Sequence, residues 1–289
     1  MNPLAIFMGL IGRLPLSWLR LLGRVTGWLF YTVSARRRHV VLTNLKLCFP
    51  QFSEPERQEL AKTHFILLGQ SLWDRAWLWH ATESELEKRI QFTGDFSIFE
   101  DTSPLIVLAP HFVGLDAGGA AMTVLKRIPM ACVYVPLRNA YVEDWVMKGR
   151  NRSGHVQSVQ RNDGAQPLLK ILRQGVRLHY SPDMDFGIQG AVWAAFFGVK
   201  AATTNTLPRI AKLAGARVCT LVTRLTPQGY AVELGPVWSS FPGEDVEADV
   251  GWMNHDIEQQ VMKSVAQYYW VHKRFKTRPE GQPSVYAQR

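Results

Sequence analysis

The fold is decided by one apolar stretch and the glycine-rich loop after it: Leu105-Ile106-Val107-Leu108-Ala109-Pro110-His111-Phe112-Val113-Gly114-Leu115-Asp116-Ala117-Gly118-Gly119. Residues 105–109 predict a short buried strand that ends at Pro110. His111 follows in a loop, and Asp116 is expected in the first turn of the next helix. A histidine beside a carboxylate is a common general base at neutral pH, because the carboxylate fixes the tautomer of the ring. The alternative is a core histidine that is merely hydrogen-bonded.

The two residues meet only under one condition. Residues five apart do not share a helical face, so Asp116 must reach back to a histidine that lies in the loop. Glycines at 114, 118 and 119 permit the close backbone approach that this needs.

Helical and strand patterns alternate through the rest of the chain. Strands are predicted at 105–109, 130–135, 176–181, 218–223 and 230–234, and helices at 54–81, 118–126, 141–150, 166–174, 204–214 and 252–270. This order predicts an α/β sandwich around a mixed, mostly parallel sheet. Sites in such sheets gather at the carboxyl ends of strands, so His111 and Asp183 are expected to face one crevice.

The amino-terminal segment predicts an attachment to a membrane. Residues 1–31 are dense in apolar and aromatic side chains, and Arg13, Arg20 and Arg24 recur on one helical face. No charge-free run reaches the ~18 residues of a clear spanning helix, and no signal cleavage site is evident. We expect residues 1–35 to form an anchoring helix, which either lies in the interface or spans it marginally, and residues 36–289 to form the catalytic domain. The alternative is an amphipathic core helix.

Charge and cysteine content narrow the possible partners. The 289 residues carry a formal net charge of +9 with 47% hydrophobic residues and 10 Trp, which favours an anionic membrane. No zinc-ligand spacing or RNA-recognition signature supports nucleic-acid binding. Cys48, Cys132 and Cys219 lie far apart in apolar runs, so we expect buried thiols in a reducing compartment, with no disulfide and no metal site.

Three further segments could carry chemistry. Arg150 and Arg152 close a predicted helix and could clamp a phosphate or an oxyanion, or simply favour the helix terminus. Asp183 and Asp185 follow a strand and could bind a metal, pair with an arginine or orient a substrate, or form an ordinary acidic turn. The run 195–203 with Phe196 and Phe197 could line an acyl-chain groove, or form a buried hairpin. No nucleophile elbow is present, which favours direct attack by a substrate group over a covalent intermediate.

These motifs together resemble the lipid A late (secondary) acyltransferase branch of the lysophospholipid-acyltransferase-like superfamily. The resemblance covers nearly the whole chain, through 40–50 (VVLTNLKLCFP), His111-x4-Asp116, 144–152, 181–185, 196–199 and 269–281 (YWVHKRFKTRPEG). The segments 40–50 and 269–281 are the most specific. Two departures are notable: many members have Glu at the position of Asp116, and glycerolipid relatives often have Asn where Pro110 stands.

The resemblance implies a glycerolipid-acyltransferase-like fold and an activity. The activity is transfer of a fatty acyl group from acyl carrier protein to a hydroxyl on an acyl chain of a phosphorylated lipid A precursor, with no cofactor. It implies an inner membrane of a Gram-negative bacterium, with the catalytic domain on the cytoplasmic side. His111 would be the general base and Asp116 its orienting partner, and Arg150 and Asp183 match positions associated with activity. Arg150 or backbone N–H groups near Gly114 would hold the oxyanion.

The remaining expectations concern binding. Arg152, Asp185, Phe196 and Phe197 are candidate substrate contacts. The basic group Lys273, Arg274, Lys276 and Arg278 is a candidate docking surface for the acidic carrier and the phosphorylated lipid, with a solvated helix end as its alternative. Two other functions stay open: an acyltransferase that uses glycerolipids or other amphiphiles, and a non-catalytic membrane-bound lipid or phosphate binder.

Overall fold

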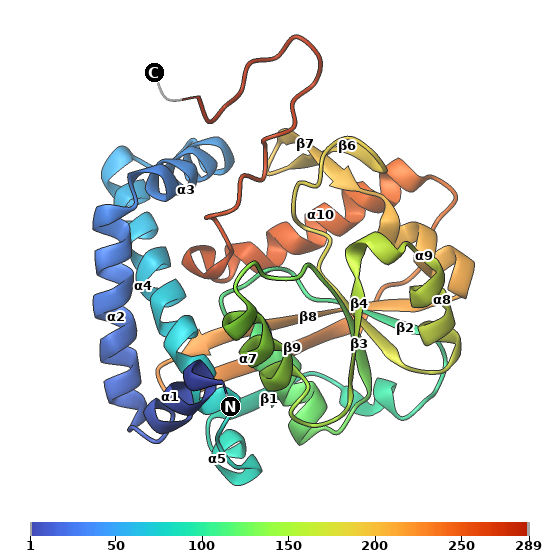
Figure 1. Cartoon of the computed structure of the whole chain (residues 1–289). Helices are drawn as coiled ribbons and strands as arrows, with labels where there is room; N and C mark the ends of the chain where they lie inside the picture. Colours follow the sequence, from blue (N-terminus) through green and yellow to red (C-terminus); the bar gives the residue numbers. More distant parts are fainter. Residues whose placement is uncertain (1, 288–289) are drawn as a thin grey trace.

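The computed structural model describes residues 2–287 and shows an α/β fold (Figure 1). The strands are β1 (Ile90–Thr93), β2 (Leu105–Leu108), β3 (Met130–Tyr134), β4 (Val156–Gln160), β5 (Arg177–Tyr180), β6 (Ala191–Phe196), β7 (Val199–Thr204), β8 (Arg217–Thr226) and β9 (Gly229–Val237). The helices are α1 (Pro3–Ile11), α2 (Leu16–Val33), α3 (Ala35–Cys48), α4 (Glu54–Leu78), α5 (Glu83–Glu87), α6 (Leu115–Ala120), α7 (Ala140–Arg150), α8 (Gln166–Arg173), α9 (Thr206–Ala214) and α10 (Val246–Met262).

A seven-stranded sheet organises the molecule, in the order β1-β9-β8-β2-β5-β3-β4. Only the β8–β9 pair is antiparallel, so the prediction of a mixed, mostly parallel sheet is confirmed. The strands β6 and β7 form a separate antiparallel hairpin, which confirms the hairpin alternative for residues 195–203. The edge strand β4 and the short β1 were not predicted, because neither has a continuous apolar run.

The sheet is covered on both faces. Along β2, Ile106 and Leu108 pack into one apolar core with α3, α9 and α10, whereas Leu105 and Val107 pack into a second core with α1, α6 and α7. This alternation is what a strand buried on both sides produces. The long helix α4 contributes to both cores, through Phe65 to the first and Trp77 to the second.

The amino-terminal region differs from its prediction. Instead of one anchoring helix it forms α1 and α2, which are bent by 120° at their junction. Within residues 2–287, no helix alone has the length and apolar composition to cross a membrane, although this bent pair does when taken together. Arg20 is not on the outer face with Arg13 and Arg24; it is buried and bridges Asp74 at 2.9 Å.

The carboxy-terminal helix is also shorter than predicted. It spans Val246–Met262 rather than 252–270, because Asp245 caps it earlier and the chain after Met262 turns back toward the sheet. Residues 265–277, which we call the C-terminal strap, begin with a 3-10 turn and then run in irregular conformation over the end of β2. Figure 1 shows this segment leaving α10 and passing between α3 and the β6–β7 hairpin.

Candidate active site

The site lies where β2 and β5 end side by side. These parallel strands pair Leu108 with Tyr180, and the Ala109 N–H donates to the Tyr180 carbonyl at 2.8 Å. Pro110 ends β2, so His111 turns into the loop, and Asp183 occupies the matching place after β5. The expectation that His111 and Asp183 face one crevice is confirmed.

Asp183 holds His111 by two contacts. Its Oδ1 lies 2.7 Å from His111 Nδ1, and its Oδ2 accepts the His111 backbone N–H at 2.9 Å. Burial of Asp183 would raise the pKa of its carboxyl, but the contacts with His111 outweigh burial and hold that pKa below its usual value. The carboxylate therefore stays ionised and fixes a proton on Nδ1, which leaves Nε2 as the basic nitrogen. No residue in 2–287 hydrogen-bonds Nε2, and the side chain is 22% exposed.

The predicted contact between Asp116 and His111 is wrong, because His111 is held by Asp183 instead. Asp116 does lie in the first turn of α6, as predicted, but two arginines hold its carboxylate. Arg75 Nε contacts Oδ2 at 2.7 Å, and Arg150 contacts Oδ1 through Nε at 3.0 Å and Nη2 at 2.9 Å. Burial would raise the pKa of Asp116, but Arg150 and Arg75 together hold it well below its usual value.

This arrangement gives Arg150 a defined place in the site. Asp116 uses its Nε and Nη2, while Nη1 has no hydrogen-bond partner within residues 2–287. The sheet register sets His179 of β5 beside Cys132 of β3, and the charges of Arg150, Asp116 and His111 all act on His179. Burial, followed by Arg150, lowers the pKa of His179 to about 4, so this ring is neutral beside the cluster.

The C-terminal strap fastens the loop that carries His111. The Tyr269 N–H donates to the His111 carbonyl at 2.8 Å, and the Val113 N–H donates to the Gln267 carbonyl at 2.9 Å. Asn44 Nδ2 of α3 donates to the Trp270 and His272 carbonyls at 2.8 Å each. The specific segments 40–50 and 269–281 are therefore joined in space next to the general-base candidate.

Asp185 belongs to this fastening and not to an open substrate surface. It is buried, and its carboxylate accepts the Thr277 backbone N–H and hydroxyl at 2.7 Å each. Its own N–H donates to His272 Nε2 at 3.0 Å. Burial lowers the pKa of His272 to about 4, which keeps that ring neutral and able to accept this bond.

The predicted basic docking surface is divided by the structure. Arg274 is 2% exposed and donates to the Ala202 carbonyl at 3.0 Å and the Thr203 hydroxyl at 2.7 Å. Arg278 donates to the Lys200 carbonyl, Lys273 is half-buried, and Lys276 is the one exposed member of this group. These residues do not form one docking face, because the strap alternates between buried and exposed positions.

The other candidate substrate contacts have structural partners. Arg152 donates to the Leu78 carbonyl at 2.6 Å and to the Ala81 carbonyl, so it caps the end of α4. Phe196 is fully buried, and Phe197 packs against Phe49 with the ring centroids 4.9 Å apart. A groove for an acyl chain is not formed by these rings, because the tip of the hairpin packs into the core.

Several site residues were not predicted from the sequence: Arg75, His179, Tyr268 and His272. Arg75 lies far from Asp116 in the sequence, and only the passage of α4 beside α6 brings it there. His111 and Asp183 line a cavity of about 10 Å³ with Asn44, Met184, Tyr268, Tyr269, Trp270, His272 and Arg274. Within residues 2–287 no group of three or more His, Cys, Asp or Glu side chains is arranged to hold a metal ion.

Fold and site define a class of protein: an α/β protein with a histidine–carboxylate pair at the carboxyl ends of two parallel strands. Such a pair can take a proton from a bound hydroxyl group. The model of the bacterial lipid A biosynthesis acyltransferase family matches residues 4–277. The chain belongs to this family, which confirms the resemblance carried by its motifs, and it is an acyltransferase of lipid A biosynthesis.

Relatives with similar sequences come from Escherichia coli K12. The chain is 32% identical to a lipid A biosynthesis palmitoleoyltransferase over 281 residues, covering 95% of this chain and 90% of that protein. It is also 32% identical to a lauroyltransferase of the same pathway over 284 residues, covering 96% and 91%. Among solved structures, the 1-acyl-sn-glycerophosphate acyltransferase PlsC from Thermotoga maritima matches with a TM-score of 0.38 and 13% identity, covering 88% of this chain and 99% of that chain. The fold described above rests on this chain's own topology.

Proposed function

We propose that this acyltransferase moves a fatty acyl group from acyl carrier protein to a hydroxyl on an acyl chain of a phosphorylated lipid A precursor. The observation that carries the mechanism is the 2.7 Å contact between His111 Nδ1 and Asp183 Oδ1, with Nε2 open to a substrate. In this mechanism His111 is the general base, and Asp183, rather than Asp116, is its orienting partner.

In this reaction His111 carries one proton from the acceptor hydroxyl to the leaving sulfur. His111 Nε2 takes the proton of the acceptor hydroxyl while its oxygen attacks the thioester carbonyl. The tetrahedral intermediate then expels the thiolate of the carrier, and protonated His111 returns the proton to that sulfur. No covalent acyl-enzyme forms, and the ionised Asp183 stabilises the imidazolium between the two transfers.

Arg150 is the candidate for the oxyanion of that intermediate. Its Nη1 is unused within residues 2–287, and Asp116 fixes the guanidinium by two contacts. A donor that is already oriented stabilises developing charge without reorganisation. The Gly114 N–H is the other donor close to His111, since the N–H groups of Phe112 and Val113 already bond the Pro110 and Gln267 carbonyls.

We also propose that the protein works on the cytoplasmic face of the inner membrane of a Gram-negative bacterium. The outer face of α2 exposes large apolar side chains, namely Trp18, Leu21, Val25, Trp28, Leu29, Phe30 and Val33, and the exposed Ile6, Phe7 and Leu10 of α1 add to them. Such a face is favourable in a membrane interface.

The membrane proposal is tested with vesicles. The double variant Trp18→Ser, Trp28→Ser should bind anionic phospholipid vesicles at least about tenfold more weakly than the parent in a sedimentation assay. Trp252→Ser is the matched control, because Trp252 is 50% exposed on α10, away from this face. Equal loss in both proteins would contradict attachment through α2.

The activity is tested with detergent-solubilised protein. The assay contains carrier protein loaded with fatty acids of several lengths, since the relatives are named for different acyl groups, and a tetra-acylated lipid A precursor. We expect one added acyl mass by mass spectrometry, and a loss of several orders of magnitude in rate in His111→Ala. Activity only on a lysophospholipid would support the glycerolipid alternative. Lipid binding without any transfer would contradict catalysis.

A further inference from the structure

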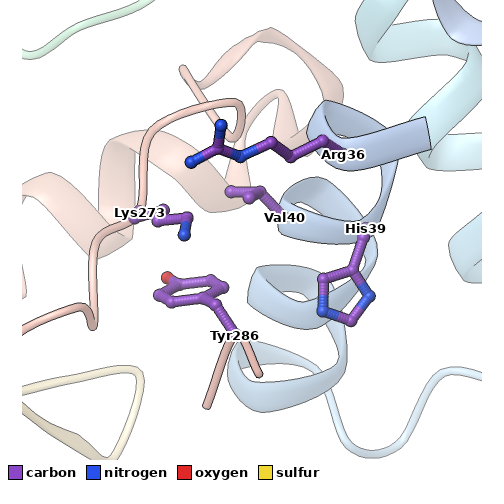
Figure 2. Close-up of a pocket in the computed structure, with 5 residues that line it drawn as sticks. All are labelled: Arg36, His39, Val40, Lys273 and Tyr286. Atoms are coloured by element: carbon purple, nitrogen blue, oxygen red, sulfur yellow. The ribbon is translucent and has the colours of Figure 1, made fainter. Parts of the chain in front are cut away.

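A second cavity lies between α3 and the carboxy-terminal segment. Its volume is about 260 Å³, and it is lined by Arg36, His39, Val40, Lys273 and Tyr286. Figure 2 shows Arg36 and Val40 extending from α3 toward Lys273 and Tyr286 of the carboxy-terminal chain, with the His39 ring to the right of the helix. In the part of the chain that the structure describes, no acidic side chain lines this cavity.

The cations of this cavity lack counter-charges. Within residues 2–287, no carboxylate lies within 4.0 Å of Arg36 or Lys273. By contrast, Lys148 and Lys212 each form an ion pair with a carboxylate. Two neighbouring arginines are satisfied differently: Arg37 Nη1 donates to the Val271 carbonyl at 3.1 Å, and Arg38 donates to carbonyls at the end of α2. Within residues 2–287, Arg36 is the one of these three arginines whose guanidinium makes no hydrogen bond, so it can meet a ligand.

The helix adds to the positive potential. The cavity is built on the first turns of α3, where the helix dipole is positive and where three arginines stand with no acidic residue. Cations at this end of a helix are unfavourable unless an anion is near them. His39 Nε2 is buried and has no hydrogen-bond partner among residues 2–287, so a further polar group of the cavity wall is unsatisfied there.

We propose that this cavity is a phosphoryl subsite that holds a phosphate group of the acceptor lipid. The proposal rests on the proposed function and names how that acceptor is held. A guanidinium fork and an ammonium group that converge without a counter-ion match a phosphate dianion. Tyr286 also lines the cavity, and Lys273 Nζ lies 5.3 Å from the centroid of its ring.

The subsite is placed to position a substrate for His111. Lys273 stands between His272 and Arg274, which both line the small cavity at His111. The Tyr286 hydroxyl donates to Asn44 Oδ1, and Asn44 also lines that cavity. A shared wall therefore separates the two cavities, so one ligand can place its phosphate in one and its hydroxyl near the other.

A lipid is favoured over free phosphate as the source of the anion. The exposed apolar face of α2 ends at Val33, which is 70% exposed and only three residues before Arg36. An amphiphile with its chains along α2 would bring its headgroup to Arg36.

The experiment measures steady-state kinetics with two acceptors, the phosphorylated precursor and the same lipid after enzymatic dephosphorylation. Arg36→Gln and Lys273→Gln should each raise KM for the phosphorylated acceptor about tenfold, with kcat nearly unchanged. KM for the dephosphorylated acceptor should be the same in parent and variants. Lys170→Gln is the matched control, because Lys170 is an exposed cation on α8.

A binding measurement separates this proposal from the proposed function. Detergent micelles that carry either lipid, and inorganic phosphate alone, are titrated into the full chain by calorimetry without an acyl donor. Arg36-dependent binding of phosphorylated micelles without turnover would support the subsite while the proposed function failed. Turnover with an unchanged KM in both variants would overturn the subsite, as would inorganic phosphate binding as tightly as the lipid.

Discussion

At the scale of single residues, one carboxylate holds both the ring and the backbone of His111. Asp183 reaches Nδ1 and the amide N–H at once, so neither the tautomer nor the direction of the ring is left free. Asp116 has a different task, because its two arginine contacts set Arg75 and Arg150 in place. The two acidic residues therefore hold different side chains: Asp183 holds His111, and Asp116 holds the two arginines.

The role of Asp116 predicts an effect on stability. Asp116→Asn keeps the size of the side chain but leaves Arg75 and Arg150 without their shared counter-charge. We expect a loss of about 1–3 kcal/mol in the free energy of unfolding, reduced from the value for fully buried pairs because both arginines are about one-third exposed. Urea denaturation measures it.

The control for this prediction is an exposed carboxylate. Asp144 bridges Lys148 at 2.7 Å on the surface of α7, with its side chain 39% exposed. Asp144→Asn should change stability by no more than about 0.5 kcal/mol. If both variants unfold at the same urea concentration as the parent, Asp116 is not the anchor of the arginines.

The sequence located His111, Asp183 and Arg150 but assigned one contact wrongly. His111 and Asp183 could be predicted because each directly follows an apolar strand, and strand ends meet in a parallel sheet. The Asp116 contacts could not, because they depend on how α4 passes α6, and no local pattern encodes that crossing. The alternation of buried and exposed positions after α10 was missed for the same reason: the strap takes its conformation from the His111 loop and from α3.

At the scale of elements, the helix pair α2–α4 is built on glycines. A Cβ at Gly69 would lie 2.3 Å from the Gly23 carbonyl oxygen and 2.7 Å from the Gly27 nitrogen. The two helices therefore touch backbone to backbone. This contact explains why α2 buries Gly23 and Gly27 on the side toward α4, while most of its large apolar side chains point outward.

This close packing predicts a large effect for one methyl group. Gly69→Ala should destabilise the protein by about 1–3 kcal/mol, because backbone cannot move aside as a flexible side chain can. Gly251→Ala is the matched control within α10, since a Cβ there meets nothing within 4 Å. The control should be neutral or stabilising by about 0.5–1 kcal/mol. Equal thermal midpoints for both variants would contradict the packing argument.

At the scale of the whole molecule, three histidines are kept neutral inside the fold. Burial lowers the pKa of His64, His179 and His272 to about 4 each. They come from α4, from β5 and from the C-terminal strap. The folded state therefore keeps neutral histidine rings in the helical layer, in the sheet and in the strap. His64 Nδ1 also donates to the Ala266 carbonyl at 2.9 Å, which ties α4 to the strap.

These histidines predict a pH dependence of stability. The unfolded chain binds protons at these histidines below about pH 6.5, whereas the folded state binds them only near pH 4, so stability falls as the pH drops through this window. Each group contributes about 1.4 kcal/mol per pH unit there. Urea midpoints at pH 7, 6 and 5 should decline steeply.

A variant identifies the groups responsible for this slope. His64→Asn keeps a donor for the Ala266 carbonyl but cannot be protonated, so the slope should become shallower. His155→Gln, at an exposed histidine, should leave the slope unchanged. A flat profile between pH 7 and pH 5 in the parent would contradict the buried, neutral state of these rings.

We propose that His111 acts as the base and that Asp183 is its partner. The most direct test is single-turnover acyl transfer at saturating substrate, measured for Asp183→Asn and for Asp116→Asn. Removal of the Asp183 charge should lower the rate about 10²–10⁴-fold, because the ring loses both its tautomer control and the stabilisation of its imidazolium. In Asp116→Asn the rate should fall much less, because the Asp116 carboxylate contacts Arg75 and Arg150 and not the ring. A near-parental rate in Asp183→Asn, or a larger loss of rate in Asp116→Asn than in Asp183→Asn, would contradict the pairing of His111 with Asp183.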